Sequence, residues 1–144
     1  MRKVAPRIHA VFARDSCHAV IFRRGPARAV CTIGWDRSND KFTMGQWLRG
    51  RTYERRADLS PDGKYLIYFA RGERWDAPLK GSWTAVSRAP FLKAVSLWSK
   101  GDTCNGGGLF TGPERFWLNQ GCTDELIFAD GRLKRDEKYP WTEG

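Results

Sequence analysis

The sequence of 144 residues has the usual length of a single domain, and 41% of its residues are hydrophobic and 13% aromatic. Seven Trp and eight Phe provide enough apolar surface to offset the entropy cost of folding, which excludes a largely disordered chain. Apolar runs such as residues 66–70 are far shorter than the roughly 20 residues that span a bilayer. We therefore expect one β-rich domain over residues 1–144 and no membrane span.

The formal net charge of +9 comes entirely from the first half of the chain. Residues 1–74 contain 16 Lys and Arg against 7 Asp and Glu, whereas residues 75–144 contain 9 of each. Arg outnumbers Lys by 17 to 8, and a planar guanidinium suits phosphate, carboxylate and aromatic partners better than an ammonium does. This asymmetry predicts an acidic partner for the first half. A source rich in basic, arginine-rich proteins would give the same composition without such a partner.

No secretory signal is predicted, because no apolar run follows the basic residues at the start of the chain. We expect a cytoplasmic, reducing environment in which Cys17, Cys31, Cys104 and Cys122 are free thiols. A zinc site at Cys17, His18 and Cys31 is disfavoured, because adjacent residues on a strand point to opposite faces. The sequence therefore predicts neither a metal nor a cofactor.

Two β-hairpins are predicted in the first 48 residues. Residues 8–13 and 17–22 form the first, and a turn at residues 23–26 ends it. Residues 27–35 and 41–48 alternate between apolar and polar positions and form the second, joined by the polar turn at residues 36–40. In residues 41–48, strict alternation places Met44 and Trp47 on opposite faces.

Residues 58–70 carry the strongest local signal in the chain. Ser60, Pro61, Asp62 and Gly63 have the chemistry of a tight turn, with Gly63 at positive φ, and a run of strand-forming residues follows at once. This segment resembles the turn-and-strand unit of WD40-like, TolB-type β-propeller blades, in which the turn lies between adjacent strands of a blade. A closed ring commonly needs four to eight blades of about 40 residues, so the resemblance implies part of a propeller at most.

The rest of the chain is predicted to continue as short strands. We expect a long loop at residues 71–82, strands at 83–88 and 91–98, a glycine-rich loop at 99–108 and strands at 109–110 and 114–119. Residues about 27–70 and 83–128 echo one another, which predicts two similar units. The expected fold class is all-β, with antiparallel meanders forming a sandwich or a partial propeller-like stack.

Six large aromatic side chains are predicted to be mostly buried in one contiguous core, since several of them recur at similar places in the two echoed units. These are Trp35, Trp47, Trp83, Trp98, Phe110 and Trp117.

Nothing in the sequence indicates a catalytic site. Both histidines, His9 and His18, lie near the start of the chain on predicted strands, and no pair of carboxylates stands out from the sixteen acids. The glycines at 106–108 lack the Gly-Lys-Ser/Thr that follows a phosphate-binding loop, so we interpret them as a turn where side chains would clash. We therefore predict that the chain is not an enzyme.

Arginines and aromatic residues alternate between residues 47 and 75, which is the pattern that an anionic or nucleic-acid partner requires. The alternative is that the arginine stems only cover core aromatics or protect a strand edge. We predict a binding module that uses a basic face against an acidic protein or a nucleic acid. Two alternatives are an inhibitor or immunity-type protein that blocks a larger partner, and an enzyme on a phosphorylated or sugar substrate. The predicted contact residues are Arg49, Arg51, Tyr53, Arg55, Arg56, Arg71 and Arg74.

Overall fold

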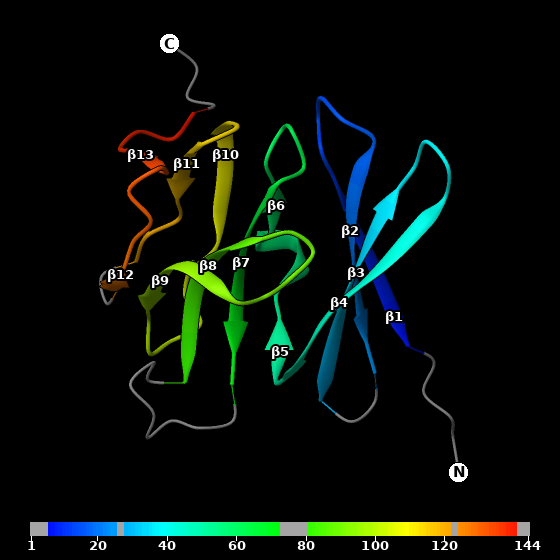
Figure 1. Cartoon of the computed structure of the whole chain (residues 1–144). Helices are drawn as coiled ribbons and strands as arrows, with labels where there is room; N and C mark the ends of the chain where they lie inside the picture. The colour runs from blue at the N-terminus through cyan, green and yellow to red at the C-terminus, as the bar shows by residue number, and fades with distance from the viewer. Residues whose placement is uncertain (1–5, 26–27, 73–80, 122–123, 141–144) are drawn as a thin grey trace.

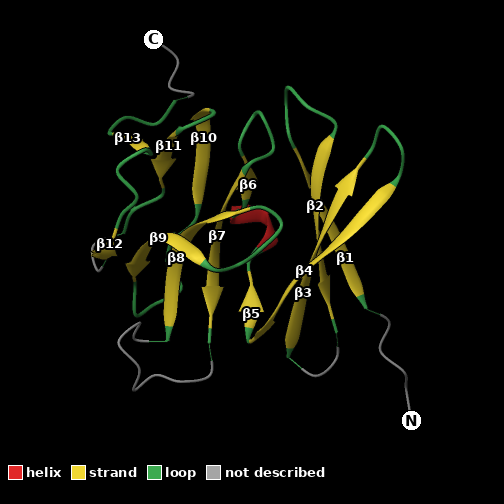
Figure 2. Ribbon diagram, in the orientation of Figure 1, coloured by secondary structure: helices red, strands yellow, loops and turns green. Residues whose placement is uncertain are grey.

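The computed structural model describes residues 6–25, 28–72, 81–121 and 124–140, and within them the chain is all-β. The regular structure consists of strands and one single-turn 3-10 helix, η1(Glu54–Arg56), as Figure 2 shows. The predicted fold class is therefore confirmed. No helix in the described ranges is long and apolar enough to cross a bilayer.

The first sheet is an antiparallel meander formed by the two predicted hairpins, in the order β1-β2-β3-β4. Its strands are β1(Arg7–Phe12), β2(His18–Arg24), β3(Ala29–Asp36) and β4(Lys41–Arg49). A β-bulge interrupts the β3–β4 ladder, because Cys31 pairs with Trp47 whereas Ile33 pairs with Met44. The extra residue in β4 puts Met44 and Trp47 on the same face. The strict alternation that we predicted for residues 41–48 is therefore wrong.

The chain passes from the first sheet to the second at Gly50. Its φ is +138°, and its amide donates a hydrogen bond of 2.7 Å to the carbonyl oxygen of Arg28. A Cβ on Gly50 would overlap the carbonyl oxygen of Arg71, so a side chain does not fit here. The next strand pairs Thr52 with Ala70, which fixes the position of the following η1 turn.

The second sheet has the order β12-β9-β8-β7-β5 with β6 also paired to β7, and in Figure 1 it extends from β12 at the left to β5 near the centre. Its strands are β5(Arg51–Thr52), β6(Asp58–Leu59), β7(Tyr65–Arg71), β8(Ser82–Arg88), β9(Ala94–Ser99) and β12(Glu125–Phe128). The third sheet is formed by β10(Gly108–Gly112), β11(Arg115–Leu118) and β13(Lys134–Asp136). Its β11–β13 ladder is parallel, unlike the antiparallel meanders that we expected.

The turn predicted between residues 58 and 70 is confirmed. The amide of Gly63 donates to the carbonyl oxygen of Ser60 at 2.9 Å, and the amide of Ser60 donates to the carbonyl oxygen of Tyr65 at 2.8 Å. Gly63 has a φ of +79°, as the turn chemistry requires. The strand that follows is buried from Tyr65 to Ala70, because the second sheet is covered on both faces.

Two hydrophobic cores separate the three sheets. The first contains Val20 and Phe22 of the first sheet with Leu66 and Tyr68 of β7. The second contains Ile67, also of β7, and residues of the third sheet. Alternate side chains of β7 therefore enter opposite cores. The arrangement is a stack of three β-layers.

The single aromatic core that we predicted is wrong. Trp98 and Phe110 are buried, but they belong to the second core only. Trp35, Trp83 and Trp117 are half-buried, and Trp47 is 60% exposed. Trp47 faces outward because of the β4 bulge.

Other boundaries differ from the prediction in smaller ways. Strand β9 begins at Ala94 rather than at residue 91, because the amides of Leu92 and Lys93 donate to Oε1 of Gln46 at 2.6 and 2.8 Å instead of joining a ladder. Residues 27–70 and 83–128 each extend over two sheets, and their repeat relationship stays a prediction. Most of the loop predicted at 71–82 lies outside the described residues.

Candidate functional site

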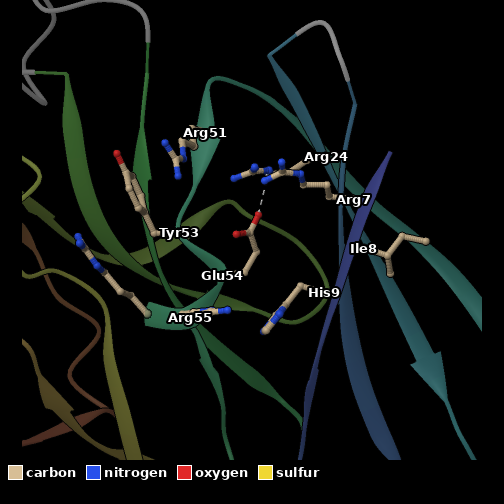
Figure 3. Close-up of a pocket in the computed structure, with 9 residues that line it drawn as sticks. Arg7, Ile8, His9, Arg24, Arg51, Tyr53, Glu54 and Arg55 are labelled. Carbon is tan, nitrogen blue, oxygen red and sulfur yellow. Dashed lines mark ion pairs between the residues drawn. The ribbon is translucent and has the colours of Figure 1, made fainter. Parts of the chain in front are cut away.

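A cavity of about 490 Å³ opens where the edge strand β1 of the first sheet faces the β5–η1 segment. Five arginines line it, and we call it the arginine pocket (Figure 3). Its lining residues are Arg7, Ile8, His9, Arg24, Arg51, Tyr53, Glu54, Arg55 and Arg56. The residues come from two sheets, so the pocket exists only when the first and second layers are packed together.

The ring of Tyr53 is a fixed platform at one side of the pocket. It packs against the ring of Phe69 with 5.0 Å between the centroids. The guanidinium carbons of Arg51 and Arg56 lie 4.6 and 4.8 Å from the centre of the Tyr53 ring. Such cation–π contacts restrict the rotamers of both arginines while their charges are retained.

Arg56 is held by the rest of the fold. Its Nη1 donates hydrogen bonds to the carbonyl oxygens of Thr103 at 2.8 Å and Asn105 at 2.6 Å, and its side chain is half-buried. Arg56 therefore differs from the exposed contact residue that we predicted. It connects η1 to the glycine-rich loop.

Among the described residues that line the pocket, Glu54 is the one acid. Its Oε1 lies 3.5 Å from Nε of Arg24, and the hydroxyl of Thr52 donates to the same oxygen at 3.4 Å. The dashed line in Figure 3 marks the Arg24–Glu54 pair. Both side chains are about one-fifth exposed, so their opposite charges offset each other within the pocket.

Besides Arg56, whose guanidinium is bonded to main-chain carbonyls, the charge that Glu54 does not offset belongs to Arg7, Arg51 and Arg55. All three are exposed, and none has an ion pair with a carboxylate in the described parts of the chain. His9, on β1, also lines the pocket (Figure 3). Three guanidinium groups therefore remain available to an oxyanion at one cavity.

The structure brings together four of the seven predicted contact residues: Arg51, Tyr53, Arg55 and Arg56. Arg49 lies on β4, outside the lining of the pocket, and Arg71 is the ladder partner of Arg51 without lining the cavity. Arg74 lies outside the described residues.

Sequence reasoning missed Arg7, His9, Arg24 and Glu54. Arg7 and His9 are two residues apart on β1, which places them on one side of it, but the strand predicted at residues 8–13 began after Arg7 and nothing local shows that it faces η1. Arg24 follows the strand that we predicted at residues 17–22 and was interpreted as part of a turn. Finding these residues requires the packing of the first sheet on the second.

A second, larger cavity of about 890 Å³ lies between the ends of the same two sheets. Cations and acids both line it, among them Lys41, Lys64 and Arg88 together with Asp36 and Asp62. This mixture of signs selects no class of charged ligand. The described residues contain no cluster of three or more His, Cys, Asp or Glu placed to hold a metal ion.

Comparison with known proteins gives no relative from which a role could be transferred. The chain matches no protein-family model, no curated protein and no solved structure.

Proposed function

We propose that this chain is a non-catalytic binding module that receives an oxyanion of an acidic partner, a phosphate or a carboxylate, in the arginine pocket. The observation that carries the proposal is the placement of Arg7, Arg51 and Arg55 around one cavity in which Glu54, the one acid among the described lining residues, is already paired with Arg24. Guanidinium groups pair with phosphate and carboxylate oxygens through charge-assisted hydrogen bonds.

The pocket also has its donors arranged before any ligand arrives. Arg51 rests against the Tyr53 ring, and Tyr53 is supported by Phe69 and by the anchored Arg56. When a ligand binds such a site, the protein's side chains lose less conformational entropy. More of the charge attraction therefore contributes to affinity. The described residues that line the pocket include no Ser, Thr, Cys or Lys beside a base, and binding is the role that we propose for it.

The test uses anionic polymers without bases or apolar groups, namely inorganic polyphosphate and poly-glutamate. In ¹⁵N-labelled protein, we expect the largest shifts at the Nε–Hε groups of Arg51 and Arg55 and at the amide of Tyr53. Shifts confined to Arg88 and Arg132, which line the second cavity, would contradict the proposal.

A matched pair of variants separates the pocket from net charge. Replacing Arg7, Arg51 and Arg55 together by Ser removes three charges at the pocket. Replacing the exposed Arg14, Arg88 and Arg132 by Ser removes three charges elsewhere. We expect the first variant to lose polyanion affinity steeply and the second to lose little. Equal losses would show that overall charge, not the pocket, determines binding.

A further inference from the structure

The first sheet has a bare apolar face on the side away from the second sheet. We call it the outer face. Its largest exposed side chains are Ile8 at 68%, Phe12 at 49%, Phe42 at 57%, Met44 at 59% and Trp47 at 60% exposure. The opposite face of the same sheet supplies Val11, Val20, Phe22 and Val30 to the first core. The outer face is therefore not needed to hold the described layers together.

The ladder register places these side chains in three adjacent rows across the four strands. One row contains Phe12, Ala19, Trp35 and Phe42. The next contains Ala10, Ile21, Ile33 and Met44, and the third contains Ile8, Arg23, Cys31 and Trp47. Because the bulge in β4 restores Trp47 to this side, every strand contributes to one continuous surface.

The aromatic rings of this face already associate with one another. The ring centroids of Trp35 and Phe42 are 6.0 Å apart with their planes 15° from parallel, and those of Phe12 and Trp35 are 6.2 Å apart. A large apolar side chain that is about half exposed presents on the order of 100 Å² to solvent, so the three aromatic residues together with Ile8 and Met44 present about 500 Å². A patch of this size on a single chain commonly has a binding role.

The charges on the outer face are positive. Arg23 stands within one row, Arg49 follows Trp47 by two residues on the same side of β4, and the Arg37 guanidinium lies 5.1 Å from the centre of the Phe12 ring. The strands of the first sheet contain one acid, Asp36, which alternation places on the opposite face. At the rim, Asp40 accepts the indole hydrogen of Trp35 at 3.0 Å.

These charges exclude a second copy of the chain as the best occupant. Two outer faces placed together would oppose arginine to arginine, which costs free energy across a contact. The available area is also smaller than the roughly 800 Å² per partner of a standard interface. The occupant must instead be anionic and must present flat apolar groups.

We propose that the outer face binds the bases of a single-stranded nucleic acid by stacking, while the flanking arginines pair with its phosphates. Single strands combine a charged backbone with exposed π-faces, and proteins bind them with positive grooves and aromatic platforms. Ile8 belongs to both surfaces, because it stands in a row of the outer face and also lines the arginine pocket. The inference rests on the proposed function in that the pocket then holds a phosphate of the same strand.

The experiment measures binding of labelled 12-nucleotide oligothymidylate and of an abasic strand with the same length and charge. Trp47→Leu and Phe42→Leu each remove a ring but keep an apolar side chain, and Trp47→Phe keeps a ring. Phe128→Leu is the matched control, because Phe128 is 45% exposed on β12 of the second sheet. Thermal unfolding of each variant confirms that it is folded, and the two Leu variants test the face independently.

We expect oligothymidylate to bind more tightly than the abasic strand, and each Leu variant to weaken oligothymidylate binding about ten-fold while leaving abasic binding unchanged. Trp47→Phe and Phe128→Leu should retain most of the affinity. Equal affinity for the two strands, or no effect of either Leu variant, overturns the inference. So does a dimer that Trp47→Leu dissociates, which would assign the face to a second copy. A loss of poly-glutamate binding in Trp47→Leu would assign it to an acidic protein.

These experiments distinguish a failure of the proposed function from a failure of the outer-face inference. The Arg7, Arg51 and Arg55 variant should weaken both strands alike, because both carry the same phosphates. If the abasic strand binds through the pocket and bases add nothing, the outer-face inference falls and the proposed function stands. If the pocket variant binds both strands as the wild type does, the proposed function falls.

Discussion

The guanidinium of Arg56 donates a hydrogen bond of 2.6 Å to the main-chain carbonyl of Asn105, across 49 positions of sequence. This bond joins the basic first half of the chain to the glycine-rich loop of the second half. A Cβ on Gly107 of that loop would overlap the carbonyl oxygen of Arg56, and one on Gly106 would overlap the Phe69 ring. The prediction that these glycines avoid side-chain clashes is therefore confirmed.

Neighbouring arginines in η1 should differ sharply in their effect on stability. Because Arg56 makes two charge-assisted bonds to carbonyls, Arg56→Ala should lower the free energy of unfolding by about 1.5–3 kcal/mol. Arg55→Ala removes an exposed side chain and should change it by less than about 0.5 kcal/mol. Urea denaturation of both variants measures the difference. Similar midpoints would contradict the anchoring role of Arg56.

Gly50 should not tolerate a side chain. Gly50→Ala combines a φ of +138° with overlap of the Arg71 carbonyl, and we expect a loss of at least about 2 kcal/mol together with weaker polyanion binding, because β5 and the arginine pocket shift. Gly131→Ala is the control, since a Cβ there meets nothing within 4 Å. Thermal unfolding compares the two. A Gly50→Ala protein as stable as the wild type would show that the backbone between the first and second sheets tolerates a side chain at this position.

Lys100 and Asp124 form a buried ion pair in the second half of the chain. Nζ lies 3.0 Å from Oδ1, and each side chain is 1% exposed. Within the described residues, Asp124→Leu leaves the ammonium with the 3.4 Å contact to the partly exposed Asp102, and should cost about 3–5 kcal/mol. The double variant Lys100→Met with Asp124→Leu should recover much of that loss. If the losses of the two single variants add up to the loss of the double variant, the cycle would contradict a stabilising interaction between Lys100 and Asp124.

Stability should depend on pH through Asp58. Burial raises the pKa of this carboxyl, although the amide of Phe110 donates to it at 2.7 Å. The native state therefore binds the proton more readily than the unfolded state, and stability falls as pH rises from about 4 through the raised pKa. Asp58→Asn removes the cost of burying a charged carboxylate. The free energy of unfolding of this variant, relative to wild type, should therefore be larger at pH 7 than at pH 4. Urea denaturation at both pH values measures this difference. A variant whose free energy of unfolding, relative to wild type, is larger at pH 4 than at pH 7 would contradict the prediction.

Much of the strand order was predictable because its causes are local. Alternating apolar residues and turn chemistry such as Ser60–Gly63 identify strands without knowledge of the fold. The β4 bulge was not predictable, because it depends on the hydroxyl of Thr32 on the neighbouring strand. This hydroxyl accepts a hydrogen bond from the main-chain amide of Gln46 at 3.1 Å and donates one to the main-chain carbonyl of Gln46 at 3.4 Å. That one register change moved Trp47 from the predicted core to the outer face.

The candidate site was predictable only in part, for a similar reason. The cluster from Arg51 to Arg56 is visible because its members are adjacent in sequence. Arg7 and Arg24 join it from another sheet, and Gly50 sets the geometry that brings the sheets together. Sequence clustering also could not separate Arg56, which anchors the glycine-rich loop, from Arg55, which faces solvent.

The central claim is that Arg7, Arg51 and Arg55 neutralise phosphates or carboxylates of the partner, and its most direct test is the salt dependence of binding. Affinity for the abasic strand is measured across a series of salt concentrations for wild type and for the triple Ser variant. Each neutralised phosphate contributes about 0.7 to the slope of log affinity against log salt for a single strand, so loss of three contacts should reduce the slope by about 2. A variant with the wild-type slope and affinity would contradict the account.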